Sequence, residues 1–150
     1  MMKKILFILS LLVIGSLYAK TIFSDPKPTM ENPRKFIFPL STANEKEISH
    51  LIGTTNRVME TYGSNNCEVV IVCYADGIKT VQKNAVFKDK NITKRMKDLL
   101  LSDVEILACN KTLKSRKIKP SELIEDVDIV DAGVVEIIER QVDGYIYVRP

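Results

Sequence analysis

Apolar runs of strand length alternate with segments of helical periodicity along most of the chain. The runs expected to form strands cover residues 35–40, 67–74, 104–108, 127–130 and 145–148. Between them, apolar residues recur every three or four positions, which is typical of amphipathic helices. The main predicted helices cover residues 43–62, 92–100, 111–118 and 134–143. Repeated strand–helix alternation predicts an α/β fold with about five mostly parallel strands in a three-layer α/β/α sandwich.

The run at residues 67–74 is the densest in strand-forming residues and carries one charge, at its second position. It is the expected central strand, because a parallel strand covered on both faces has a nearly continuous apolar sequence. Asp76 and Gly77 follow it directly. Ligands of open parallel sheets bind beyond the carboxyl ends of strands. We therefore expect Asp76 and Gly77 to share one rim with the end of the 104–108 strand, if the two strands are neighbours.

The first helix has a clear start in the sequence. Thr42 and Glu45 form a capping-box pattern, in which each side chain satisfies a backbone N–H at the helix start. Gly63 is the expected end of this helix.

Residues 1–19 have the pattern of a secretory signal peptide. Lys3 and Lys4 precede an apolar run over residues 5–14, and Ala19 is a small residue at the expected cleavage point. The apolar run is shorter than the ~20 residues needed to span a membrane. We expect export to the periplasm with no stable membrane anchor after cleavage. Residues 20–34 contain three prolines and are expected to form a linker to a domain at 35–150.

Composition excludes several classes of function. The chain has 22 Lys and Arg against 19 Asp and Glu, and removing residues 1–19 takes away two lysines and no acid, leaving 20 against 19. A nearly neutral domain does not predict nucleic-acid binding. His50 is the one histidine, and the sequence has no closely spaced Cys/His cluster, so we expect no metal site. It also has no phosphate loop or dinucleotide fingerprint, so we expect no cofactor.

Cys109 is the strongest candidate for chemistry. It follows a buried strand, and Asn110 is a good N-cap for the helix expected after it. The positive end of that helix and the cations Lys111, Lys114 and Arg116 would favour the thiolate. The alternative is an unreactive cysteine buried at the end of a strand.

The other two cysteines have weaker predictions. Cys67 is expected to be a small core residue. Cys73 lies near the end of its strand, as Cys109 does, and is a candidate redox partner if the two α-carbons lie within ~7 Å. Three cysteines cannot all pair within one chain, so at least one thiol remains free, modified or bonded to another chain.

Three segments give the domain a family resemblance. They are residues 108–118, the acid-and-valine strand leading to residues 131–134, and the tail at 139–147. In these segments the chain resembles the DsrE/DsrF-like family of small sulfur-relay proteins, particularly its exported single-domain branch. The resemblance implies a flavodoxin-like sheet and a homo-oligomer such as a dimer, trimer or hexamer. It also implies that Cys109 carries sulfane sulfur as a persulfide and exchanges it with a thiol or persulfide of a partner protein.

The chain departs from the family pattern at residues 74–77, where relatives often have His-Gly and this sequence has Tyr-Ala-Asp-Gly. Any role for that histidine is absent.

Two hypotheses for function follow. In the first, Cys109 carries the sulfur, with Asn110 orienting the turn, Thr112 hydrogen-bonding the sulfur and Arg116 holding negative charge nearby. In the second, the protein is a non-catalytic, oligomeric small-ligand-binding or assembly protein that uses the rim of Asp76, Gly77 and Cys109 as a pocket between subunits.

Overall fold

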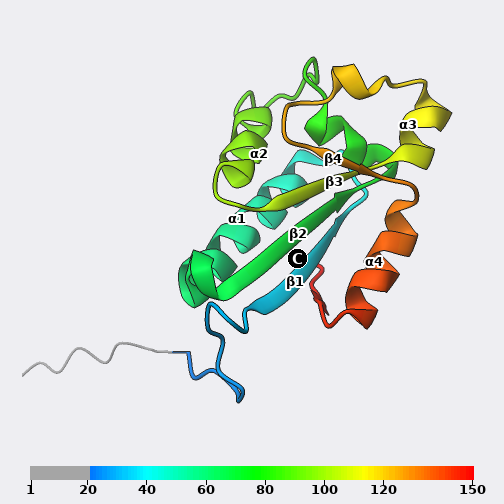
Figure 1. Cartoon of the computed structure of the whole chain (residues 1–150). Helices are drawn as coiled ribbons and strands as arrows, with labels where there is room; N and C mark the ends of the chain where they lie inside the picture. The colour runs from blue at the N-terminus through cyan, green and yellow to red at the C-terminus, as the bar shows by residue number, and fades with distance from the viewer. Residues whose placement is uncertain (1–20) are drawn as a thin grey trace, which may run out of the picture.

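One sheet of five parallel strands runs through the part of the chain that the computed structural model describes, residues 21–150 (Figure 1). The strands are β1 (Arg34–Leu40), β2 (Cys67–Cys73), β3 (Glu105–Cys109), β4 (Asp128–Val130) and β5 (Ile146–Tyr147). Their order in the sheet is β4-β3-β2-β1-β5, and every pair is parallel. The predicted α/β class is confirmed. The signal peptide expected at residues 1–19 lies outside the described residues.

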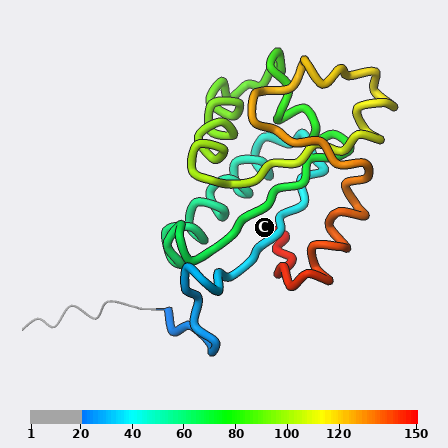
Figure 2. Tube along the Cα trace, in the orientation of Figure 1, coloured from blue at the N-terminus to red at the C-terminus, as the bar shows by residue number. Residues whose placement is uncertain are grey.

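Helices cover the sheet unequally on its two faces. The helices are α1 (Glu45–Tyr62), α2 (Ile92–Leu100), α3 (Asn110–Arg116) and α4 (Gly133–Val142), and three short 3₁₀ segments are η1 (Ser64–Asn66), η2 (Ala75–Val81) and η3 (Pro120–Glu122). Side chains of α1, α2 and α3 share one apolar cluster with the sheet, whereas α4 packs on the opposite face. The trace in Figure 2 shows α4, in orange and red, on the other side of the sheet from α1 and α2. The three-layer arrangement is therefore as predicted.

The chain path explains this division. Strands β1 to β4 advance in one direction across the sheet, and right-handed crossovers in one direction place their helices on one face. The chain then returns from β4 at one edge to β5 at the other, beside β1, and α4 crosses the opposite face on the way.

The central strand β2 has the burial that its sequence predicts. Six of its seven residues are buried, and only Glu68 is exposed. Val69, Ile71 and Cys73 face the helices α1 and α2, whereas Val70 and Val72 face α4. Because both faces exclude water, both sets of alternating positions are apolar.

The neighbouring strands β2 and β3 end at the same edge of the sheet. Cys73 pairs with Ala108 in the parallel register, so the η2 turn and the start of α3 follow from adjacent positions. The two strands are therefore neighbours, as the expected rim of Asp76, Gly77 and the end of β3 required.

The segment expected to be a linker lies against the domain. The ring of Phe23 stacks on Tyr62 with centroids 4.8 Å apart, and the guanidinium of Arg34 donates to the carbonyls of Ser24 and Pro26, each at 3.1 Å. These contacts hold residues 23–26 at the edge of the sheet where β1 begins (Figure 1).

A polar cluster holds the C-terminal end of α4 on the sheet. The Arg140 guanidinium donates to Glu105 at 2.6 Å, to Glu136 at 2.7 Å and to the Tyr145 hydroxyl at 3.0 Å. That hydroxyl donates in turn to Glu68 at 2.8 Å. Burial, reinforced by the hydrogen bond to Glu68, raises the pKa of Tyr145 to about 12. The cluster therefore joins α4 and the chain after it to β2 and β3.

Among residues 21–150, no helix has both the length and the apolar character needed to cross a membrane.

Gly77 provides a test of how tightly the η2 turn closes on β1. A Cβ at this position would lie 1.9 Å from the carbonyl oxygen of Leu40. We expect Gly77→Ala to lower the free energy of unfolding by about 3 kcal/mol, because backbone must move to accept the methyl group. Chemical denaturation measures this change.

Gly53 is the matched control for this substitution. A Cβ there would meet no atom within 4 Å, and the residue lies inside α1. Gly53→Ala should stabilise the protein by roughly 0.5–1 kcal/mol. Equal stability of the two variants would contradict the close contact at Gly77.

Candidate functional site at Cys109

Cys109 ends β3 and immediately precedes α3, which begins at Asn110. Its backbone is extended, with φ −74° and ψ 113°, so Cys109 itself occupies the N-cap position. The expectation that Asn110 caps the helix is wrong by one residue. The backbone turns one step earlier than the sequence suggested, which places a sulfur where a cap oxygen usually lies.

The sulfur of Cys109 lies against the first turn of a second helix. The backbone N–H of Gly133, the first residue of α4, donates to Sγ at an N···S distance of 3.2 Å. A Cβ on Gly133 would lie 3.1 Å from Val72, 3.2 Å from Cys109 and 3.3 Å from Tyr74 side-chain carbons. Only glycine lets the backbone come this close without displacing a neighbour.

Gly133 is a site residue that the sequence analysis missed. Its sequence signal is a glycine that follows a short strand and opens a helix. That position indicated a connection between elements, but it did not indicate which side chain the backbone N–H would reach.

Thr112 links the sulfur to the turn after β2. The Thr112 hydroxyl oxygen accepts the backbone N–H of Ala75 at 3.2 Å. The same side chain hydrogen-bonds Cys109 and lowers the pKa of its thiol. Because the oxygen already accepts from Ala75, the hydroxyl proton is available for the sulfur. Ala75 has a left-handed backbone, φ 46°, which is uncommon for a residue with a Cβ.

Two opposing effects determine the ionisation of Cys109. Burial, with 6% of the residue exposed, raises the pKa of the thiol. Hydrogen bonds from the Thr112 hydroxyl and from the backbone N–H groups of Gly133, Thr112 and Lys111 lower it, and the net pKa lies below the usual value for cysteine. The amides of α3 contribute to this shift although none reaches the geometry of a helix-cap hydrogen bond.

Arg116, which was expected to hold negative charge near the sulfur, forms its ion pair with Asp76. Its guanidinium pairs with the Asp76 carboxylate at 2.6 Å, and both side chains are substantially exposed. The pair joins η2 to α3, beside the Ala75–Thr112 hydrogen bond. An exposed ion pair of this kind contributes about 0–1 kcal/mol to stability, so its main effect is to orient the two segments.

Gly77 has a packing role in place of the expected ligand-binding one. It is buried, and the space that its missing Cβ would fill is occupied by the backbone of Leu40 and Ser41. Of the three expected rim residues, Asp76 is exposed, whereas Cys109 and Gly77 are buried.

Cys73 and Cys109 are not brought together. Cys73 faces the α1–α2 side of the sheet, where its sulfur lies 3.7 Å from the Thr80 hydroxyl, whereas the Cys109 sulfur faces α4. A disulfide cannot join side chains that point to opposite faces without a change in the backbone. Complete burial raises the pKa of Cys73 to about 12, which is unfavourable for a redox-active thiol. Cys67 is buried, as expected for a core residue.

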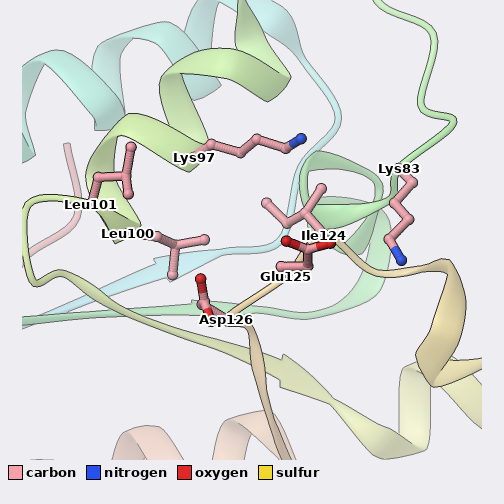
Figure 3. A pocket seen from close by; sticks show the side chains of 7 residues that line it. All are labelled: Lys83, Lys97, Leu100, Leu101, Ile124, Glu125 and Asp126. Atoms are coloured by element: carbon pink, nitrogen blue, oxygen red, sulfur yellow. The ribbon is translucent and has the colours of Figure 1, made fainter.

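A separate cavity lies between the end of α2 and the chain before β4 (Figure 3). Its volume is about 380 Å³, and it is lined by Lys83, Lys97, Leu100, Leu101, Ile124, Glu125 and Asp126. Two lysines and two carboxylates surround its apolar side chains, and none of these residues belongs to the Cys109 rim. Within residues 21–150, no group of three or more His, Cys, Asp or Glu side chains is placed to hold a metal ion.

Comparison with known proteins identifies relatives of this arrangement. The DsrE/DsrF-like family matches residues 36–150. A search of curated proteins finds no match.

Three solved structures are similar to the chain. A protein of unknown function from Methanobacterium thermoautotrophicum, MTH1491, has a TM-score of 0.71 and 24% identity, covering 78% of this chain and 99% of its own. The ychN protein from E. coli has a TM-score of 0.58 and 16% identity, with coverages of 77% and 97%. BT1422, a conserved protein of unknown function from Bacteroides thetaiotaomicron, has a TM-score of 0.53 and 14% identity, with coverages of 76% and 92%. At these identities the likeness shows a shared fold.

Thr112 provides a test of how the site ionises. Thr112→Val keeps the shape of the side chain and removes the hydroxyl, so the pKa of Cys109 should rise and less thiolate should be present at neutral pH. Because hydrogen bonds to charged groups contribute about 1.5–3 kcal/mol, we expect the alkylation rate of Cys109 at pH 7 to fall about tenfold.

The measurement is the pH dependence of iodoacetamide modification at Cys109, followed by peptide mass. In the wild type the rate should rise with pH with a midpoint below the usual pKa of cysteine, and Thr112→Ser should retain most of this behaviour. Unchanged profiles for Thr112→Val would show that the hydroxyl does not stabilise the thiolate.

Proposed function

Because this chain belongs to the DsrE/DsrF-like family, we propose that it handles sulfane sulfur and carries it as a persulfide on Cys109. The observation that carries the proposal is the set of donors around the Cys109 sulfur. The Gly133 N–H contacts it at 3.2 Å, and the Thr112 hydroxyl hydrogen-bonds it. A thiol must be ionised to attack sulfur, and these donors favour the ionised form despite burial.

The proposed transfer moves one sulfur atom from a donor persulfide to Cys109. The Cys109 thiolate attacks the terminal sulfur of a donor persulfide, R–S–SH. A new S–S bond forms on Cys109, the donor S–S bond breaks, and the donor leaves as the thiolate R–S⁻ with the electron pair. Charge and sulfur atoms balance, and no external oxidant is consumed. The reverse exchange with an acceptor thiolate returns the sulfur and restores Cys109.

Each neighbour has a defined part in this exchange. Gly133 and Thr112 donate hydrogen bonds to the attacking sulfur, so they stabilise it before attack and again after the sulfur is handed on. The backbone N–H of Ala75 orients the Thr112 hydroxyl, and the Asp76–Arg116 pair holds the Ala75 turn on α3. Cys73 has no part because its side chain faces the other side of the sheet.

The cellular setting is part of the proposal. The signal-peptide pattern of residues 1–19 supports a periplasmic protein whose partners are thiols or persulfides of that compartment.

Persulfide formation is the direct test. We expect reduced protein incubated with a small persulfide, such as glutathione persulfide, to gain the mass of one sulfur atom, and dithiothreitol to remove it. Cys109→Ser should abolish the gain, whereas Cys73→Ser should retain it because that thiol is fully buried. A gain that persists in Cys109→Ser would refute persulfide carriage on Cys109, as would a wild type that gains no sulfur from either a small persulfide or an inorganic polysulfide. Intact-protein mass spectrometry measures each outcome.

Assembly, the second candidate function, is favoured by the outer surface of α4. Val134, Ile138 and Val142 repeat every four residues along this helix and are 55%, 51% and 80% exposed, and Val135 beside them is 53% exposed. A row of large apolar side chains facing water is typical of interaction sites. The protein is therefore expected to form a homo-oligomer through α4, and this assembly is compatible with sulfur carriage.

Val142 tests the assembly with a closely matched control. Val142→Lys should shift the protein toward monomer, because burying a lysine in an apolar interface is unfavourable. Val86 is also 80% exposed but lies in a loop remote in sequence from α4, so Val86→Lys should leave the assembly unchanged. Light scattering after size-exclusion chromatography measures the mass. A monomeric wild type, or equal masses for all three proteins, would contradict assembly through α4.

A further inference from the structure

The surface that follows Cys109 along the chain is strongly basic. Residues 111–119 contain five cationic side chains and no acidic one, and all five are exposed: Lys111, Lys114, Arg116, Lys117 and Lys119. We call this group the α3 basic surface. Arg116 is paired with Asp76, whereas within residues 21–150 none of the four lysines has an ion-pair partner. The positive charge of the four lysines is therefore available to solutes.

The α3 basic surface begins next to the sulfur. Cys109 is the N-cap of α3, so Lys111 lies in the first turn after it and Lys114 in the second. Two acidic residues lie on the segments that contact the start of α3. Asp76 is neutralised by Arg116, and the backbone carbonyl of Asp131 accepts the Lys111 N–H at 3.2 Å. Because Arg116 is paired with Asp76, Lys111 and Lys114 are the uncompensated cations of α3 closest in sequence to the thiol.

Access to the sulfur is narrow. Cys109 is only 6% exposed, and the first turn of α4, the Thr112 side chain and the end of β2 surround it. A donor with a thin, unbranched end reaches such a sulfur more readily than a bulky one. The hydrogen-bond donors at the sulfur are also arranged to favour negative charge.

From the charge and the narrow access together, we propose that the sulfur donor of Cys109 is a small, unbranched anionic sulfur species, of which inorganic polysulfide is the representative. This inference rests on the proposed function and specifies its substrate class. The Cys109 thiolate attacks the terminal sulfur of a hydropolysulfide anion, HSₙ⁻. An S–S bond forms to Cys109, the terminal S–S bond of the donor breaks, and Sₙ₋₁²⁻ leaves with the electron pair. Cys109 becomes the persulfide S–SH, and charge and atoms balance.

The lysines are expected to raise the local concentration of anions near the thiol. In water at low salt, a unit charge about 10 Å away changes the local concentration of a monovalent anion by roughly twofold, and several such charges multiply. At physiological ionic strength the effect is reduced, because the screening length is then about 8 Å. An anion preference that disappears as salt is added is therefore the expected signature.

Two alkylating probes of similar size separate charge from reactivity. Iodoacetate is an anion and iodoacetamide is neutral, and both react with the same thiolate. We expect the ratio of their rates at Cys109, followed by peptide mass, to exceed the ratio for 2-mercaptoethanol severalfold at low salt and to approach it at high salt. Differences in thiol ionisation cancel in this ratio.

Paired substitutions identify the responsible charges. Lys111→Gln with Lys114→Gln should lower the low-salt ratio about fourfold, because two nearby charges are removed. The control is Arg57→Gln with Lys97→Gln, which removes two exposed charges from α1 and α2 and should leave the ratio nearly unchanged. A ratio equal to that of 2-mercaptoethanol, or equal effects of the two pairs, would overturn the inference.

Inorganic polysulfide provides the second readout. Its rate of persulfide formation on Cys109 should fall by at least the same factor in the Lys111/Lys114 pair and not in the control pair. If glutathione persulfide loads Cys109 but polysulfide does not, the anionic small-molecule donor is wrong while the proposed function stands. If neither loads Cys109, the proposed function fails.

Discussion

The close approach of α4 to Cys109 is the constraint on which the site depends. The Gly133 N–H reaches the sulfur at 3.2 Å only because residue 133 has no Cβ to meet Val72, Tyr74 and Cys109. At its other end, α4 is held to β2 and β3 through Arg140 and Tyr145. The helix is therefore fixed at both ends, and a backbone amide becomes part of a site that otherwise belongs to β3 and α3.

Cys73 and Cys109 form an internal comparison of what burial does to a thiol. They lie on neighbouring strands of one sheet and are both buried, yet their pKa values shift in opposite directions. Desolvation dominates at Cys73, where the Thr80 hydroxyl offers the one opposing hydrogen bond. At Cys109 several donors converge and outweigh desolvation. The largest of these contributions comes from the Thr112 side chain of α3, and the α4 face of the sheet adds the Gly133 N–H at the start of a second helix.

Much of the fold followed from the sequence, because long apolar runs and helical periodicity are local signals. The β2 run, the helix over α1 and the position of Cys109 at a strand end are of this kind. Details that depend on contacts distant in sequence were not predictable. Glu45 does not complete the predicted capping box: Asn44 caps α1, and the Glu45 carboxylate accepts the N–H groups of Lys88 and Asp89. Arg116 likewise found Asp76, forty residues earlier in the chain.

The packing of residues 23–26 determines at which end of the strands the described chain enters the domain. Phe23 rests on Tyr62 at the end of α1, and Arg34, at the start of β1, holds the carbonyls of Ser24 and Pro26. These contacts lie at the end of the sheet where the parallel strands begin, whereas Cys109 lies at the opposite end, where the strands finish. A tag or surface linkage fused directly to residue 21 would therefore leave from the side opposite the thiol. An immobilised form of the protein built in this way would turn the Cys109 end of the sheet toward solution.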